Sequence, residues 1–287
     1  MTRRELRAMG TDVVMLLDAD DTPGVRAALD DACSELERLE QVFSRFRDDS
    51  ELSRLNRDGG GRMSADMARV VRRSLELREA TGGWFDPAVG ADVRDAGYEG
   101  SFADLPPVVP ARPPRGTRGP VTVAGASLTI APGVRIDLGA IAKGYAADAV
   151  CRLLSRRAPA LVSAGGDVVA HGLRTGGPWP VGIVTPGGQA VAALTQGAIA
   201  TSGVDRRRWV STLGEAHHVI DPHTGRPSAT DLVRVSVAAA SGADADAVAT
   251  AMLAAGSDRA GRMAVTLGVP ALAVGADGTV TRWGDLA

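Results

Sequence analysis

The sequence has 287 residues, a formal net charge of −2 and an apolar fraction of 45%. This length suffices for one large domain or two small ones, and 32 basic against 34 acidic residues argue against a nucleic-acid-binding protein, which normally has a basic surplus. No apolar run approaches the ~20 residues of a membrane helix. The N-terminal residues 1–7 have no apolar segment behind their arginines, so we expect a cytoplasmic protein. Cys33 and Cys151 make no disulfide framework or metal cluster and are expected to be buried thiols.

The first half of the chain predicts one strand and two helices. Residues 11–18 form an apolar run between polar or glycine residues, which predicts a strand. Thr22 and Pro23 are typical of a helix start, and Ser64 opens a second helix that ends at Gly82. Residues 104–120 hold six prolines and no apolar periodicity, which predicts a loop outside the core. The first helix should bury Val25, Leu29, Cys33, Leu36, Leu39 and Phe43.

The second half alternates short apolar runs with glycine-rich turns. Helical patterns at about 140–156 and 244–266 interrupt these runs, and the last two runs, at 271–274 and 279–283, predict a hairpin. Strands grouped between helices indicate an α+β fold built on largely antiparallel sheet, which we take as a single domain over residues 1–287. The other predicted strands lie at 121–123, 127–130, 160–163, 168–170, 180–184, 191–194 and 233–238.

A lone lysine marks the first candidate site. Of the 32 basic residues 31 are arginine, and the single lysine, Lys143, stands in the segment 136–148. We expect a strand that ends at Asp137 and a glycine turn that leads into a helix, whose N-terminus would attract an anion or phosphate within reach of Lys143. The alternative is an ordinary strand-to-helix junction with an exposed lysine.

Three of the four histidines fall within seven residues, at positions 217, 218 and 223. A histidine that titrates near neutrality can accept a proton from an attacking hydroxyl. Zinc ligation is the competing interpretation, but no second Cys/His pair stands at ligand spacing. A tight turn fixed by Asp221 and Thr224 is compatible with either.

Asp246 and Thr250 are four residues apart, so on a helix they share one face. A carboxylate and a hydroxyl, completed by carbonyl and phosphate oxygens, suit Mg²⁺. The alternative is structural, with Asp244 or Asp246 as a helix cap and Thr250 as a buried threonine. Weaker signals are the aromatic pair at Trp84 and the loops expected at 164–167 and 200–203, where backbone can approach a ligand.

Taken in chain order, these motifs resemble the ApbE family, the FAD:protein FMN transferases. The resemblance covers almost the whole chain, and eight motifs in register are far more specific than any one of them. The matching segments are 9–11, 43–50 with Asn56, 83–90, 137–148, 165–167, 201–203, 218–227 and 245–251.

The resemblance implies a T-fold-like architecture that holds FAD between two sub-domains. It implies a Mg²⁺-dependent reaction in which a Thr or Ser hydroxyl of an acceptor protein attacks the FMN-side phosphorus of FAD and AMP leaves. Phe46 stands where the family commonly has an aromatic hydroxyl, so ring packing is kept and a hydrogen bond is lost. By match, His218 would be the base, the Ala140 carbonyl, Asp246 and Thr250 would bind Mg²⁺, and Met9, Phe46, Trp84, Phe85, Asp86, Asp137 and Lys143 would contact FAD.

Two other functions remain open from the sequence. A Mg²⁺-dependent FAD pyrophosphatase would use the same site with water in place of the acceptor hydroxyl, and would yield FMN and AMP. A non-catalytic FAD carrier would use the binding residues alone.

Overall fold

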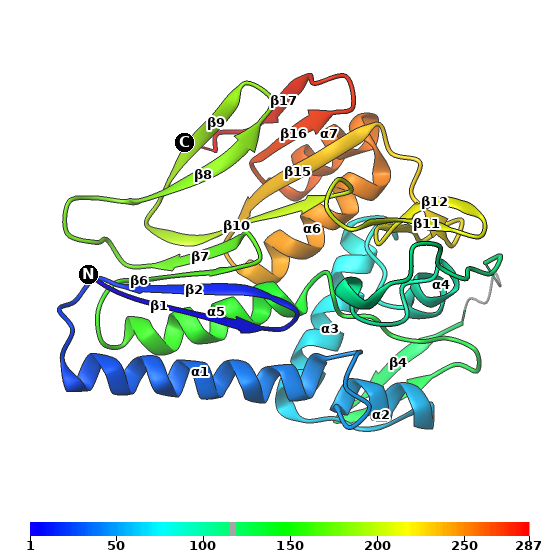
Figure 1. Ribbon diagram of the computed structural model, residues 1–287, viewed down its shortest axis with the longest axis horizontal. Coiled ribbons are helices and arrows are strands. Elements are labelled where there is room, and N and C mark those ends of the chain that lie inside the picture. Colours follow the sequence, from blue (N-terminus) through cyan, green and yellow to red (C-terminus); the bar gives the residue numbers. More distant parts are fainter. Residues whose placement is uncertain (115–118, 287) are drawn as a thin grey trace.

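The computed structural model describes residues 1–114 and 119–286. Its largest element is an eight-stranded sheet with the order β1-β2-β6-β7-β10-β15-β16-β17, in which every neighbouring pair is antiparallel (Figure 1). The α+β class and the antiparallel sheet are therefore confirmed. Its strands are β1 Thr2–Ala8, β2 Thr11–Leu17, β6 Ala160–Ala164, β7 Asp167–His171, β10 Gln196–Gly203, β15 Leu232–Ala239, β16 Ala271–Gly275 and β17 Val280–Trp283.

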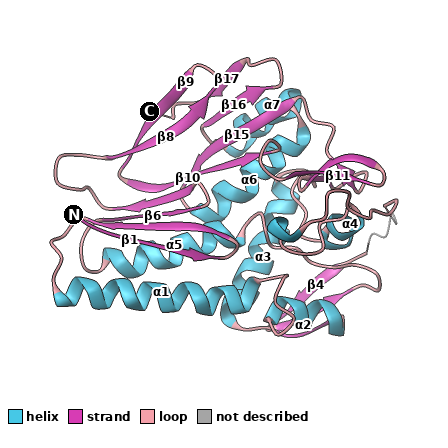
Figure 2. Ribbon diagram, in the orientation of Figure 1, coloured by secondary structure: helices cyan, strands magenta, loops and turns pink. Residues whose placement is uncertain are grey.

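Helices cover one face of this sheet (Figure 2). Helix α5 (Ala142–Ser155) packs on β6 and β7, while α6 (Gly242–Ala255) packs on β10 and β15. Helix α1 (Pro23–Phe43) lies against α5, and α7 (Ser257–Leu267) lies beside α6. Half of the residues of α6 are alanine and 12 of its residues are buried, because small side chains let it approach the sheet and α5 together.

A long hairpin covers the opposite face of the sheet. It consists of β8 (Trp179–Thr185) and β9 (Gly188–Leu194), paired along their full length. Its inward side chains, Trp179, Val181 and Ile183, join a hydrophobic cluster with residues of the central strands. The alternation of buried and exposed residues along β8 is the pattern expected of a strand with one buried face.

Smaller elements stand beside the main sheet and build the rest of the molecule (Figure 1). They include a three-stranded sheet and two short hairpins. Their bounds are α2 Glu51–Asp58, β3 Gly60–Arg62, α3 Ala65–Ala80, α4 Gly90–Asp95, a 3₁₀ turn Phe102–Asp104, β4 Val121–Ala124, β5 Ser127–Ile130, β11 Arg208–Ser211, β12 Gly214–His217, β13 Ile220–Asp221 and β14 Arg226–Pro227.

The predicted helix starts are confirmed by their caps. The Thr22 hydroxyl accepts a hydrogen bond from Val25 N at the start of α1, and the Ser64 hydroxyl accepts one from Met67 N at the start of α3. The predicted apolar face of α1 is buried except at Cys33, which is only half-buried and not the buried thiol we expected. The C-terminal hairpin is confirmed as β16 and β17.

Strand β1 and helix α2 are among the elements that the sequence did not predict, and two helices were predicted as one. Strand β1 escaped prediction because four of its seven residues are charged, and α2 because it is only two turns long. The single helix expected over 244–266 is wrong. Gly256 leaves the helical conformation with φ 79° and ψ 168°, and the Asp231 carboxylate accepts a hydrogen bond from Ser257 N at 2.9 Å, which starts α7 in a new direction.

Two predicted loops also need correction. Residues 200–203 belong to β10, which pairs with both β7 and β15, so the predicted loop is wrong. The small and polar residues of this segment had indicated a loop. In the proline-rich segment, Val109 forms a bridge with Ser211 and is buried, so the described part contributes to the core. Residues 115–118 of that predicted loop lie outside the described residues. Among the helices of residues 1–114 and 119–286, none combines the length and apolar character needed to cross a bilayer.

Candidate active site

The segment before α5 is held in place by the only asparagine of the chain. Asn56 Nδ2 donates to the carbonyl of Ile136 at 2.8 Å, and Asn56 Oδ1 accepts from Ile136 N at 2.7 Å. The side-chain amide thus takes the place of a neighbouring strand, which is why the strand expected to end at Asp137 is replaced by an irregular segment. Asp137 N donates to the carbonyl of Pro87 at 2.8 Å, which ties this segment to the 84–87 loop.

Asp137 is fixed on both sides. Its Oδ1 accepts from Gly139 N at 2.7 Å, and its Oδ2 lies 3.2 Å from Arg45 Nε. The Arg45 guanidinium carbon lies 4.3 Å from the ring centroids of both Phe46 and Tyr98. Phe46 is 45% exposed, so one edge of this stack is open to a ligand. Arg45 was not among the predicted site residues, because no local pattern reveals its contacts.

Lys143 lies in the first turn of α5, at the close crossing of α5 and α6. Its Nζ lies 2.8 Å from Asp246 Oδ2, 3.3 Å from Asp167 Oδ2 and 3.0 Å from the carbonyl of Gly139. The two carboxylates are almost fully buried, and the lysine side chain is 17% exposed. The interpretation as an exposed lysine is wrong, because the side chain is largely buried and pairs with two acids.

The charges of this cluster shift the pKa values of Lys143 and Asp246. Burial alone would lower the pKa of Lys143, but Asp246 and Asp167 raise it above its ordinary value, so the ammonium stays charged. Burial and the charge of Asp167 raise the pKa of Asp246 above its ordinary value, and the charge of Lys143 only partly offsets this rise. Asp167 was missed as a site residue because the sequence drew attention only to the backbone of its glycine loop.

The predicted metal residues lie on α6 near this cluster. Ser241, not Asp244 or Asp246, caps α6 through a hydrogen bond from Asp244 N, so the capping alternative is wrong. Thr250 Oγ1 lies 2.8 Å from Ser202 Oγ. No three Cys, His, Asp or Glu side chains gather for metal binding anywhere in the described ranges. The buried oxygens around the Lys143 ammonium are nevertheless hard ligands of the kind that Mg²⁺ prefers.

The three clustered histidines occupy different environments. His217 Nε2 donates to the carbonyl of Ser228 at 3.1 Å, a structural contact. His223 is exposed, with its Nδ1 3.3 Å from Asp221 Oδ1. His218 follows β12 directly, and burial together with the charges of Arg207, His217 and Lys143 lowers its pKa to about 3. His218 is therefore neutral at pH 7 and lies within electrostatic range of the lysine cluster.

The remaining predicted FAD residues lie in two turns. Met9 occupies the turn between β1 and β2 with φ 53°, and its N donates to Glu40 Oε2 at 2.8 Å. The ring of Trp84 is half-buried, 4.5 Å from the His223 ring. Phe85 belongs to the core, and Asp86 Oδ2 lies 3.2 Å from Arg78 Nε. The role of each of these residues toward FAD stays a prediction.

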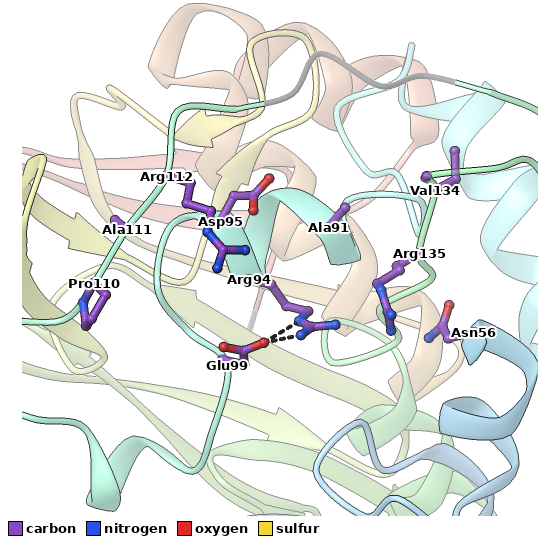
Figure 3. Close-up of a pocket in the computed structure, with 11 residues that line it drawn as sticks. Asn56, Ala91, Arg94, Asp95, Glu99, Pro110, Ala111, Arg112, Val134 and Arg135 are labelled. Atoms are coloured by element: carbon purple, nitrogen blue, oxygen red, sulfur yellow. Dashed lines mark hydrogen bonds and ion pairs between the residues drawn. The ribbon is translucent and has the colours of Figure 1, made fainter.

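A polar pocket of about 480 Å³ lies beside the segment that Asn56 holds (Figure 3). It is lined by Arg94, Arg112 and Arg135 together with Glu99, which pairs with Arg94. Figure 3 shows these side chains turned toward the same space. None of the predicted catalytic, metal or FAD residues lines it.

Comparison with known proteins places the chain in a family. The model of the ApbE family matches residues 9–273. The FAD:protein FMN transferase of Treponema pallidum is 34% identical over 265 residues, which cover 82% of this chain and 73% of that protein. That of Escherichia coli K12 is 31% identical over 247 residues, covering 79% and 70%.

Solved structures agree with the sequence comparison. The flavin transferase ApbE from Vibrio cholerae has a TM-score of 0.83 at 29% identity, and the ApbE protein from Thermotoga maritima has 0.84 at 27%. Each comparison covers 98% of this chain and 96% of the other. The predicted resemblance is confirmed, and the chain belongs to the ApbE family.

Proposed function

We propose that this chain is an FAD:protein FMN transferase, which moves the FMN part of FAD onto a Thr or Ser hydroxyl of an acceptor protein. The observation that carries the proposal is the buried cluster in which Lys143 pairs with Asp167 and Asp246. The charge of Lys143 also helps to lower the pKa of His218, the proposed base. The names of its relatives point to the same reaction. We further propose that the whole chain is one catalytic domain, since the main hydrophobic cluster contains residues from Ala8 to Ala273.

In the proposed reaction, His218 accepts the proton of the acceptor hydroxyl. The hydroxyl oxygen forms a bond to the FMN-side phosphorus of FAD, and the bond from that phosphorus to the bridging oxygen breaks. AMP leaves with the bridging oxygen and its electron pair. A low pKa keeps His218 unprotonated and available at pH 7, at the cost of a weaker base than a free imidazole.

The residues for Mg²⁺ and for FAD follow from the same proposal. Asp246, Thr250 and the carbonyl of Ala140 would hold Mg²⁺, which when bound would neutralise the pyrophosphate. Support comes from the buried oxygens that already surround an ammonium at this place. Met9, Phe46, Trp84, Phe85, Asp86, Asp137 and Lys143 would contact FAD. Phe85, a core residue, would do so through its backbone.

Incubation with FAD, Mg²⁺ and a candidate acceptor protein tests the proposal. We expect flavin that stays with the acceptor after denaturation, together with one AMP for each flavin transferred. Free FMN with no labelled acceptor would instead identify a pyrophosphatase. Intact FAD retained over hours with excess Mg²⁺ and acceptor would identify a carrier, and either result would refute the transferase.

A further inference from the structure

Lys143 holds a position that is shared between two carboxylates. Its Nζ is 2.8 Å from Asp246 Oδ2 and 3.3 Å from Asp167 Oδ2, so a shift of less than an ångström decides which carboxylate it pairs with more closely. With both acids ionised, the cluster carries one net negative charge. A cation that used the buried oxygen of Asp246 would compete with the ammonium for the same atom.

Asp167 is fixed in a position from which it can pair with the Lys143 ammonium without Asp246. Its Oδ1 accepts a hydrogen bond from Thr201 N at 3.2 Å, which fixes the carboxylate against β10. Its Oδ2 is buried and has no hydrogen-bond partner in the described part of the chain, so the Lys143 charge at 3.3 Å is what compensates it. A carboxylate buried in this way is costly without a cation beside it.

We propose that Asp167 is a positioning residue for Lys143, and that Lys143 moves from Asp246 to Asp167 when a divalent cation binds at Asp246. The inference rests on the metal site of the proposed function. Removal of Asp167 would leave the ammonium on Asp246, where it blocks the cation. Removal of the lysine would free Asp246, so the two changes should shift cation affinity in opposite directions.

The test is Mn²⁺ binding to the full chain without FAD, measured as free Mn²⁺ by electron paramagnetic resonance. Compared with the parent, Lys143→Met should bind Mn²⁺ roughly tenfold more tightly and Asp167→Asn roughly tenfold more weakly, the scale of coupling in one ion-pair network. In the Lys143→Met background, Asp167→Asn should weaken binding less than about threefold, because its effect acts through the lysine.

Charge-matched controls separate this exchange from a general electrostatic field. Asp244→Asn and Arg73→Met remove the same charges from a neighbouring ion pair, in which Arg73 Nε lies 2.7 Å from Asp244 Oδ1. Both should keep Mn²⁺ affinity within about twofold of the parent. Should Asp167→Asn fail to fold, Lys143→Met still tests the competition with Asp167 intact.

Three results would overturn the inference: unchanged affinity in Lys143→Met, an equal effect of Asp167→Asn in both backgrounds, or a parent that binds no Mn²⁺. Each is independent of flavin transfer. If the variants change Mn²⁺ affinity as expected but the parent transfers no flavin, the proposed function is refuted and the inference stands. If the parent transfers flavin and Lys143→Met has the same Mn²⁺ affinity as the parent, the inference is refuted and the proposed function stands.

Discussion

Gly144 sets the distance between the two helices that bring Lys143 to Asp246, and Gly144→Ala tests this directly. A Cβ built at Gly144 would lie 2.0 Å from the carbonyl oxygen of Gly242 and 2.3 Å from its carbonyl carbon. Both atoms are backbone, so no side chain can rotate away. To reach an ordinary contact of about 3.4 Å, α5 and α6 would have to move apart by roughly 1.4 Å.

Two effects of this substitution have opposite signs. Glycine to alanine inside a helix should stabilise it by about 1 kcal/mol through helix propensity. Overpacking of a close crossing typically costs about 1–3 kcal/mol, and here the clash is with backbone. Because backbone atoms cannot rotate away, we expect a cost at the upper end of this range and hence a net loss of about 2 kcal/mol in the free energy of unfolding. The same shift would separate Lys143 Nζ from Asp246 Oδ2, now 2.8 Å apart, and should weaken cation and FAD binding together.

Urea unfolding of the parent and the variant measures this loss, with Gly24→Ala as the matched control. Gly24 lies near the start of α1, where the three atoms nearest to an added Cβ all belong to the Arg157 guanidinium, the closest at 2.9 Å. That side chain can move, so Gly24→Ala should be neutral or slightly stabilising. A Gly144→Ala protein as stable as the parent, with unchanged FAD affinity, would refute the claim that this crossing positions the site.

The other predictions concern the proposed chemistry. His218→Ala should still bind FAD but lose roughly 10²–10⁴-fold in transfer rate, and a near-parent rate would assign the base to another histidine. Since the pKa of His218 is lowered to about 3, the rate should not fall as the pH is lowered through 6.5. Below pH 6.5 the unfolded chain takes up a proton that folded His218 does not, so the free energy of unfolding should decline there, and less so in His218→Asn. Lys143→Arg should weaken FAD binding in equilibrium titrations although the charge is kept, because a planar guanidinium does not fit between the buried carboxylates; unchanged affinity would contradict this. Asp246→Ala should stay folded and lose Mg²⁺-stimulated turnover, while Thr250→Val should raise the Mg²⁺ concentration for half-activity; turnover that is indifferent to EDTA in the parent would refute the metal site.

Local signals in the sequence determined much of the secondary structure. Thr22 and Ser64 predicted the starts of α1 and α3, because a cap acts within one helical turn and needs no distant partner. Apolar periodicity predicted the buried face of α1 and most strands of the main sheet, because this pattern is also contained within each element. Where a distant residue intervenes, local reasoning failed, as at the break between α6 and α7, which depends on Asp231.

In the candidate site, too, the sequence predicted several of the residues and only the tertiary structure showed their contacts. The motifs and their order indicated the family, and with it the expectation that His218, Lys143 and Asp246 act together. Only the tertiary structure decided that the Lys143 ammonium pairs with Asp246, 103 positions away, and with Asp167. That pairing requires α5 and α6 to touch at Gly144 and Gly242, and such a contact leaves no periodic pattern in either helix. An ion pair of this kind depends on which side chains the packing removes from water together, and a local sequence pattern does not contain that information.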